Sequence, residues 1–145
     1  MRVAEKVLID TGPIVAVLIA KDRHHQWARE HFASLSPPLF TCEAVLSEAQ
    51  FLVQNFGGDP VAVLDMIAKG VLHITFAVEA ESARLSKLQR TYRNVPMSLA
   101  DACLVRMAEL HASSRIFTSD SDFRIYRRHG NKVIPVRLPT EGVHT

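Results

Sequence analysis

The feature that most constrains the fold is a regular alternation of short apolar segments with longer segments of helical periodicity. Residues 6–9 (KVLI) form a mostly apolar, β-branched run, and Gly12-Pro13 then begins a helical segment. Further strands are expected at 39–40, 71–76, 115–118 and 132–136. Helices are expected at 24–35, 41–56, 61–69, 79–92 and 98–111, with a short helix after the fourth strand. This order predicts an α/β fold with a mostly parallel central sheet of about five strands covered by helices on both faces.

The length and composition of the chain allow one compact domain. With 145 residues and a hydrophobic content of 48%, the chain can bury a sizeable core but has no room for a second domain of ordinary size. We expect this domain to span residues 1–138 and a loose C-terminal tail to follow at 139–145. The net charge is only +2, so any basic surface that could bind nucleic acid must be local.

The cysteines and the apolar runs indicate the compartment. Cys42 and Cys103 lie far apart in the sequence and form no Cys-x-x-Cys pair, so we expect free thiols in a reducing compartment. The longest uninterrupted apolar run, residues 14–20, is too short to span a bilayer, and Asp10 interrupts the pattern of a signal peptide. We therefore expect a cytoplasmic protein with no membrane segment.

Acidic residues follow two of the predicted strands. Asp10 comes directly after the first strand, and Asp120 and Asp122 follow the fourth strand in the segment TSDSDF. Because ligands of parallel sheets collect outside the carboxyl ends of the strands, these acids are candidates for one site. An aspartate after a strand is more often a helix cap than a catalytic residue, so Asp10 alone would decide little. Residues two apart in an extended turn point in opposite directions, and we favour Asp120 for the site, with Asp122 in reserve.

Two further acids are predicted on helices. Glu48 has apolar residues such as Val45 and Phe51 three positions away, so the spacing places it on an apolar stripe, where an unpaired carboxylate is costly. The alternative is a glutamate at the margin of this stripe that reaches solvent. Asp101 also faces apolar residues, but the spacing from Ser98 resembles a capping box, which by itself explains an acid at this position.

Taken together, the carboxylates predict a site for a hard divalent cation. The four acids come from four separate segments, and like charges that converge without a cation would repel each other. Magnesium and manganese prefer oxygen ligands and keep several waters, and such a site can hydrolyse phosphodiesters. The four acids are Asp10, Glu48, Asp101 and Asp120. Three neighbouring hydroxyls could orient the attacking water or a phosphate oxygen, or only cap helices: Thr11, Thr118 and Ser119.

Four motifs in this order resemble the PIN-domain ribonucleases, and within them the VapC-like toxins of prokaryotic toxin–antitoxin pairs. The motifs are VLIDTGPIVAVL near the start, SEAQFLV in the second third, SLADACLVRMAE, and IFTSDSDF close to the end. The resemblance covers nearly the whole chain. Because each motif is short, its specificity lies in their order and spacing.

The resemblance implies a three-layer α/β/α fold and an endoribonuclease that depends on Mg²⁺ or Mn²⁺. It also implies a homodimer and a cognate antitoxin whose peptide occludes the active site. The acids of the family fall on the same four positions, and its hydroxyl before the last acid falls on Thr118. The last acid varies within the family, so the choice between Asp120 and Asp122 stays open.

Basic residues late in the chain are candidates for RNA contacts. Their side chains could follow the phosphates, with Phe123 or Tyr126 available for base stacking, or they could be an ordinary solvated surface. The candidates are Arg124, Arg127, Arg128 and Lys132, with His129 and Arg137 nearby.

Other functions share parts of this pattern. The segment IDTGP (9–13) also resembles the Asp-Thr-Gly signature of aspartic proteases, but these need a predominantly β fold, which the many predicted helices exclude. A phosphatase or another phosphoryl-transfer domain with Asp10 as nucleophile remains an alternative, although it has no evident use for Glu48. A PIN-like module that binds RNA without cutting it would require a broken set of acids, and the set is intact.

Overall fold

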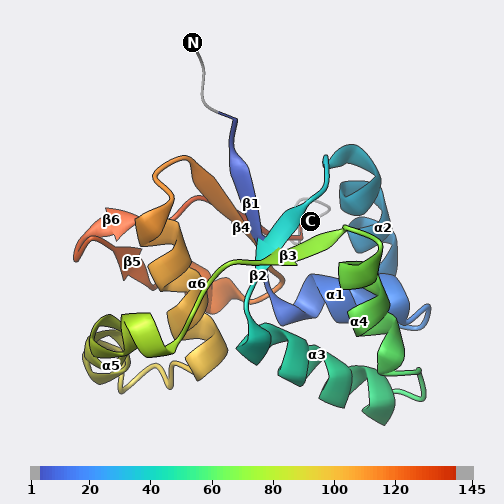
Figure 1. Cartoon of the computed structure of the whole chain (residues 1–145), viewed down its shortest axis with the longest axis horizontal. Helices are drawn as coiled ribbons and strands as arrows, with labels where there is room; N and C mark the ends of the chain where they lie inside the picture. The colour runs from blue at the N-terminus through green and yellow to red at the C-terminus, as the bar shows by residue number, and fades with distance from the viewer. Residues whose placement is uncertain (1–3, 140–145) are drawn as a thin grey trace, which may run out of the picture.

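The centre of the molecule is a five-stranded parallel sheet in the order β3-β2-β1-β4-β7 (Figure 1). The computed structural model describes residues 4–139. All four pairings in this sheet are parallel, as the alternation of strands and helices predicts. The strands are β1 (Lys6–Ile9), β2 (Leu39–Thr41), β3 (Leu72–Ile74), β4 (Ser114–Phe117) and β7 (Val136–Arg137).

Helices flank the sheet, with α5 and α6 to the left of the strands in Figure 1 and α1, α2 and α4 to the right. The predicted α/β architecture is therefore confirmed. Each helix packs an apolar face against the strands or a neighbouring helix, and α6 contacts both β1 and β4. The helices are α1 (Thr11–Leu18), α2 (His25–Ser34), α3 (Glu43–Asn55), α4 (Val61–Ala68), α5 (Ser82–Thr91) and α6 (Leu99–Leu110), with 3-10 turns η1 (Glu79–Glu81) and η2 (Ser121–Arg124).

The register of the two central strands decides where the site forms. Ile9 of β1 pairs with Phe117 of β4, and both side chains are buried. The next residues, Asp10 and Thr118, therefore leave the sheet side by side at its carboxyl edge. Because β2 and β4 lie on opposite sides of β1, the chain connections diverge here. Such a switch point is where open α/β sheets bind ligands.

The end of the chain differs from the sequence prediction. A single strand at 132–136 was expected, but Pro135 has no backbone N–H, and the segment divides around it. Lys132–Val133 is β6, which pairs antiparallel with β5 (Arg127–Arg128) in a separate hairpin, while β7 completes the main sheet. The short helix predicted after β4 ends at Arg124. Apart from Pro139, the predicted tail at 139–145 lies outside the described residues.

Candidate acidic active site

Asp10 occupies the carboxyl end of β1 and is almost completely buried, with 6% of its surface exposed. Its Oδ1 accepts a hydrogen bond of 2.7 Å from the backbone N–H of Thr11, which begins α1. Its Oδ2 accepts a second bond of 2.7 Å from the hydroxyl of Thr118. The capping role and the site position considered for Asp10 from the sequence are therefore compatible, because one oxygen caps the helix while the carboxylate stays at the switch point.

The pKa of Asp10 is raised from 3.8 to about 7, mainly by burial and in smaller part by the nearby charges of Asp101 and Asp120. The hydrogen bonds from Thr118 and from the backbone of Thr11 act in the opposite direction. The charge coupling shows that Asp10, Asp101 and Asp120 are electrostatic neighbours, although they come from β1, α6 and the segment after β4. Three of the four predicted acids therefore lie near enough for the charge of one to act on another.

Thr118 connects the two strand ends. Besides donating to Asp10, its hydroxyl oxygen accepts a bond of 3.0 Å from the backbone N–H of Asp120. The side chain is fully buried, and its single proton is already committed to Asp10. This geometry favours a role in orienting Asp10 over the water-positioning role considered from the sequence.

Asp120, and not Asp122 as expected from the sequence, caps the short helix after β4. Asp120 is itself the cap of η2, because its Oδ1 accepts a bond of 2.9 Å from the backbone N–H of Asp122. Its charge also raises the pKa of Asp10 and of Asp101. Burial raises the pKa of Asp122, and the charge of Asp120 adds to this effect. Asp120 is the better placed candidate, because its charge acts on both other aspartates.

Asp101 lies in the first turn of α6 and is partly buried. Its backbone N–H donates to the hydroxyl of Ser98, so the predicted N-terminal cap is present. Its Oδ2 accepts a bond of 2.9 Å from the hydroxyl of Tyr126. Burial raises the pKa of Asp101, the bond from Tyr126 lowers it, and the charge of Asp120 raises it again. Asp101 therefore both carries the helix cap and belongs to the acid cluster.

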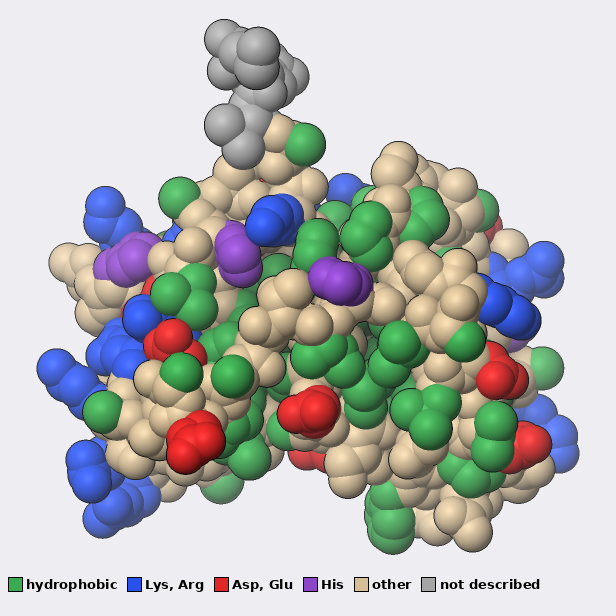
Figure 2. Space-filling model, in the orientation of Figure 1, with side chains coloured by type: hydrophobic (Ala, Val, Ile, Leu, Met, Phe, Trp, Pro, Cys, Tyr) green, Lys and Arg blue, Asp and Glu red, His purple; other side chains and the backbone are tan. Residues whose placement is uncertain are grey.

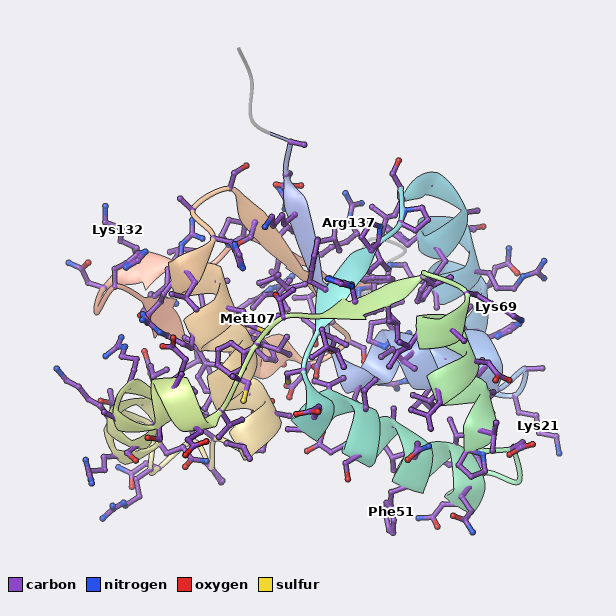
Figure 3. The ribbon with its side chains drawn as sticks, viewed as in Figure 1. Lys21, Phe51, Lys69, Met107, Lys132 and Arg137 are labelled. Carbon is purple, nitrogen blue, oxygen red and sulfur yellow. The ribbon has the colours of Figure 1, made fainter. Side chains whose placement is uncertain are left out.

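Glu48 is joined to the cluster through Thr11, whose hydroxyl donates a bond of 2.9 Å to Oε1 of Glu48. Contrary to the sequence expectation, Glu48 is exposed and does not lie on a buried stripe. Glu48 lies on α3, which is rotated so that Val45 faces the core. Phe51 of the same helix is 65% exposed and points away from the fold (Figure 3). The alternative considered from the sequence, a glutamate at the margin of the stripe, describes the structure.

Gly12 and Ser119 are in close contact beside Asp10. A Cβ atom added to Gly12 would lie 2.0 Å from Oγ and 3.3 Å from Cβ of Ser119. The Asp-Thr-Gly sequence thus has a steric reason here, because glycine lets the segment after β4 approach the start of α1. The contact holds Ser119, the third predicted hydroxyl, next to the cluster.

The chemistry of these groups fits a hydrated divalent cation. Within residues 4–139, no lysine or arginine forms an ion pair with any acid of the cluster. No three of the described His, Cys, Asp and Glu side chains already converge as a metal-binding group. Magnesium is usually held by one or two carboxylates and retains several waters, so two aspartates without a cationic partner meet its requirements. Asp10 and Asp101 are the residues that could hold such an ion.

The four predicted RNA contacts lie in and before the β5–β6 hairpin, away from β2 and β3 (Figure 1). Arg124 and Lys132 are exposed, and Figure 3 shows Lys132 at the outer end of this region. The guanidinium of Arg127 donates to backbone carbonyls, among them that of Arg124 at 2.6 Å, and Arg128 donates to the carbonyl of Ala108. These two arginines therefore also stabilise the local fold.

The stacking role considered for Phe123 and Tyr126 is wrong. Both side chains are completely buried and pack edge to face at 5.2 Å, so neither ring can receive a base. The hydroxyl of Tyr126 instead reaches Asp101, a contact that the sequence analysis missed. A tyrosine six residues after Asp120 was the available signal, but only the path of η2 shows where its ring lies.

The contacts of Glu109 were also not expected from the sequence. It accepts hydrogen bonds from Arg84 on α5, from Arg106 on its own helix and from the backbone N–H of His129. Burial would raise the pKa of Glu109, but the bonds from Arg84 and His129 outweigh it and lower the pKa to about 2. Arg84 on α5 is thereby bound to a buried acid of α6.

Comparison with known proteins agrees with this architecture. The profile of a family described as "PIN domain" matches residues 7–128. The crystal structure of VapC20 of Mycobacterium tuberculosis, described as a toxin that cleaves the sarcin–ricin loop, matches with a TM-score of 0.73 at 19% sequence identity. This match covers 81% of the present chain and 92% of the other, and it shows a shared fold. No curated protein sequence matches.

A membrane-spanning helix is not found within residues 4–139, since none of the helices there is both long and apolar enough to cross a bilayer.

Proposed function

The chain belongs to the PIN-domain family, and from this we propose that it is a divalent-metal-dependent endoribonuclease that hydrolyses phosphodiester bonds in RNA. PIN domains are nuclease domains, so a hydrolase acting on RNA is the activity to test first. One observation carries the proposal beyond family membership. Asp10, Asp101 and Asp120 come from three segments, influence one another by charge at the switch point of the sheet, and have no cationic side chain as partner within residues 4–139.

We assign the direct roles to the acids. Asp10 and Asp101 would hold the Mg²⁺ or Mn²⁺ ion, and Asp120 would add negative charge near them. Glu48, which is exposed and bonded to Thr11, accepts a proton from the attacking water or orients it. Asp122 is the reserve for Asp120. When bound, the cation supplies charge stabilisation at the phosphate and lowers the pKa of a water molecule.

The surrounding hydroxyls position these acids. Thr118 fixes Oδ2 of Asp10, and Tyr126 fixes Oδ2 of Asp101, so each aspartate keeps one oxygen in a defined direction. Ser119, which contacts Gly12 and is only partly buried, is the hydroxyl that can still orient a water or a phosphate oxygen. In the reaction, the water oxygen attacks phosphorus, one P–O ester bond breaks, and the leaving oxygen is protonated.

We further propose that the protein is the toxin of a VapBC-type pair and acts in the cytoplasm as a homodimer. The similarity of fold to the toxin VapC20 supports this role. A cognate antitoxin would then be a partner that covers the acid cluster. The nuclease unit would be the single domain at 1–138. Co-purification with the product of a small neighbouring reading frame tests the partner directly.

The enzymatic proposal is tested by incubating the purified protein with several classes of RNA and added Mg²⁺, Mn²⁺ or chelator. Internal cleavage with either ion that stops with chelator is expected. Because water is the nucleophile, a substrate without the 2′-hydroxyl at the cut position should still be cleaved. Cleavage that persists in chelator, or products that end in a 2′,3′-cyclic phosphate, would contradict the proposal. Hydrolysis of a phosphomonoester without cleavage of RNA would favour the phosphatase alternative.

A further inference from the structure

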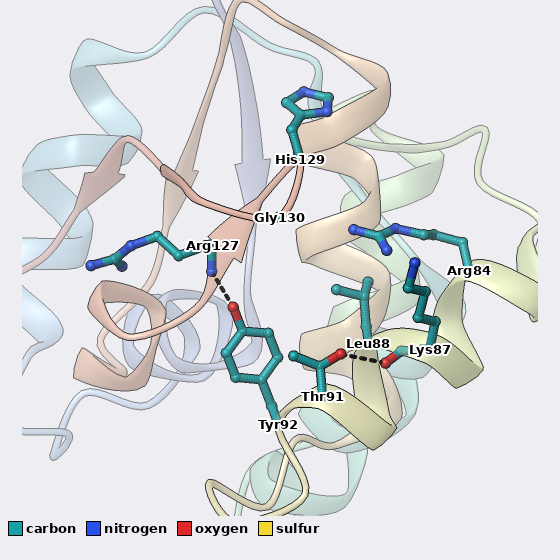
Figure 4. Close-up of a pocket in the computed structure, with 8 residues that line it drawn as sticks. All are labelled: Arg84, Lys87, Leu88, Thr91, Tyr92, Arg127, His129 and Gly130. Atoms are coloured by element: carbon teal, nitrogen blue, oxygen red, sulfur yellow. Dashed lines mark hydrogen bonds between the residues drawn. The ribbon is translucent and has the colours of Figure 1, made fainter.

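Besides the acid cluster, α5 and the β5–β6 hairpin enclose a pocket of about 310 Å³ (Figure 4). This volume lies at the lower end of the range of about 300–1,000 Å³ that is usual for small-molecule sites. Every charged residue that lines it is basic. We call it the α5 pocket, and its lining consists of Arg84, Lys87, Leu88, Thr91, Tyr92, Arg127, His129 and Gly130.

The two walls of the α5 pocket are held together by Glu109. Arg84 on α5 donates to this carboxylate, and so does the backbone N–H of His129 on the hairpin. A second bond joins the hairpin to the end of α5, because the backbone N–H of Arg127 donates to the hydroxyl of Tyr92 at 2.9 Å. Hydrogen bonds therefore hold both walls of the α5 pocket in place, so the pocket has a defined shape.

The free cation of the α5 pocket is Lys87. Figure 4 shows the side chains of Arg84 and Lys87 side by side on one wall, whereas the side chain of Arg127 points away. Arg84 is committed to Glu109, and Lys87 is exposed and forms no ion pair among residues 4–139. Lys and Arg side chains also gather around α5 on the left of Figure 2, with some acidic side chains among them. Lys87 is therefore the cation of this wall that is available to an anion.

The floor of the α5 pocket is apolar and leads toward the acid cluster. Leu88 is buried, and the ring of Tyr92 packs edge to face on Tyr126 with 5.1 Å between the centroids. The hydroxyl of Tyr126 bonds to Asp101. The α5 pocket is thus two aromatic rings away from an acid of the cluster. A cationic wall above an aromatic floor suits a nucleotide, with phosphate on the cation and base or ribose on the ring.

We infer that the α5 pocket binds one nucleotide of the RNA strand, on one side of the bond that is cut, with its phosphate on Lys87. The inference rests on the proposed function, and it adds a binding site separate from the acids. An acidic cluster repels a polyanion, so a nearby positive pocket offsets that repulsion and fixes the strand beside it. A peptide of Asp and Glu residues also carries negative charge, but it has no base that could pack on the ring of Tyr92 in the floor of the pocket.

The test measures RNA binding without cleavage. All proteins carry Asp10→Asn, and a fluorescent single-stranded RNA of about 12 nucleotides is titrated by anisotropy. Lys87→Glu is compared with Lys69→Glu, which makes the same charge change at an exposed lysine on the far side of the molecule (Figure 3). We expect Lys87→Glu to raise Kd at least about tenfold and to reduce the salt slope by about 0.7, while Lys69→Glu stays close to the parent.

The outcomes separate the α5 pocket from the proposed function. Equal affinities for the parent and both variants, or equal losses in both variants, would overturn the inference. A polyglutamate peptide that binds in a Lys87-dependent way while RNA does not would also overturn it. Lys87-dependent RNA binding by a protein whose wild-type form does not cut RNA would support the α5 pocket and refute the endoribonuclease. Circular dichroism confirms that each variant is folded.

Discussion

The hydroxyl of Thr118 donates a hydrogen bond of 2.7 Å to Oδ2 of Asp10 and so joins two residues that are 108 positions apart. The bond follows from the pairing of Ile9 with Phe117, because the next residue on each strand then meets the other at the sheet edge. The same hydroxyl accepts the backbone N–H of Asp120. One threonine therefore sets the orientation of Asp10 and of the segment that carries Asp120.

Thr118→Val removes this hydroxyl with little change in shape. A hydrogen bond to a charged group contributes about 1.5–3 kcal/mol, so we expect kcat/KM for RNA to fall by about tenfold or more. The lost bond stabilised the ionised carboxylate, so the pKa of Asp10 in metal-free protein should rise above its value of about 7. Carbon-13 NMR of the carboxyl group measures it. Thr118→Ser retains the hydroxyl and should restore both values, whereas a Val variant equal to wild type would refute the role.

Asp10→Asn should stabilise the metal-free protein. The pKa of Asp10 is raised from 3.8 to about 7, so its protonated form favours folding, and stability is lost as the pH rises through about 7. The neutral asparagine avoids this loss. We expect thermal melts at pH 8 to show a Tm several degrees higher for the variant, and the difference to vanish near pH 4. Mn²⁺ should raise the Tm of wild type only. A variant less stable than wild type at pH 8 would contradict this account.

Tyr126→Phe should impair activity more than stability. The ring remains in the core, while Asp101 loses the hydrogen bond that orients its Oδ2. We expect kcat to fall about tenfold with a smaller change in KM, and a stability loss of only about 1 kcal/mol. Tyr126→Leu is the comparison, because it removes both the ring and the hydroxyl. Similar activity losses with a much lower Tm only for Leu would support the assignment, whereas full activity for Phe would refute it.

Glu109→Gln tests the ion-pair network apart from the acid cluster. Removing the charge weakens the bonds from Arg84 and Arg106 and should destabilise the fold by about 2 kcal/mol at pH 7. The pKa of Glu109 is lowered from 4.5 to about 2, so its contribution is present above pH 4.5 and lost as the pH falls toward 2. Urea denaturation at several pH values measures the difference, which should shrink below pH 4.5. A difference that does not depend on pH would contradict the network.

The sequence was sufficient to predict the parallel sheet and the acids that gather at its edge. The run before Asp10 and the run before Asp120 mark two strands, and parallel strands end at a common edge. The cap at Ser98 was also predictable, because capping depends only on local spacing. Local patterns and the order of elements therefore carried the fold class and the places of Asp10 and Asp120 after two of its strands.

The features that escaped prediction depend on how elements rotate and pack. Whether Glu48 faces solvent depends on how α3 is rotated about its own axis. The spacing of the apolar residues in α3 determines this rotation only to within about one residue position. The buried ring of Tyr126 and the ion pair between Arg84 and Glu109 join distant segments, and no local spacing encodes them. Pro135 was visible in the sequence, but the single strand predicted at 132–136 did not allow for the interruption that a proline causes.

The central claim is that Asp10 and its neighbours hold a divalent cation that is required to cut RNA. The most direct measurement is single-turnover cleavage of RNA by wild type and by Asp10→Asn, each with saturating Mn²⁺ and each shown to be folded. Our account predicts rapid cleavage by wild type, none in chelator, and a loss of at least about a thousandfold in the variant. Equal rates for the two proteins would contradict it.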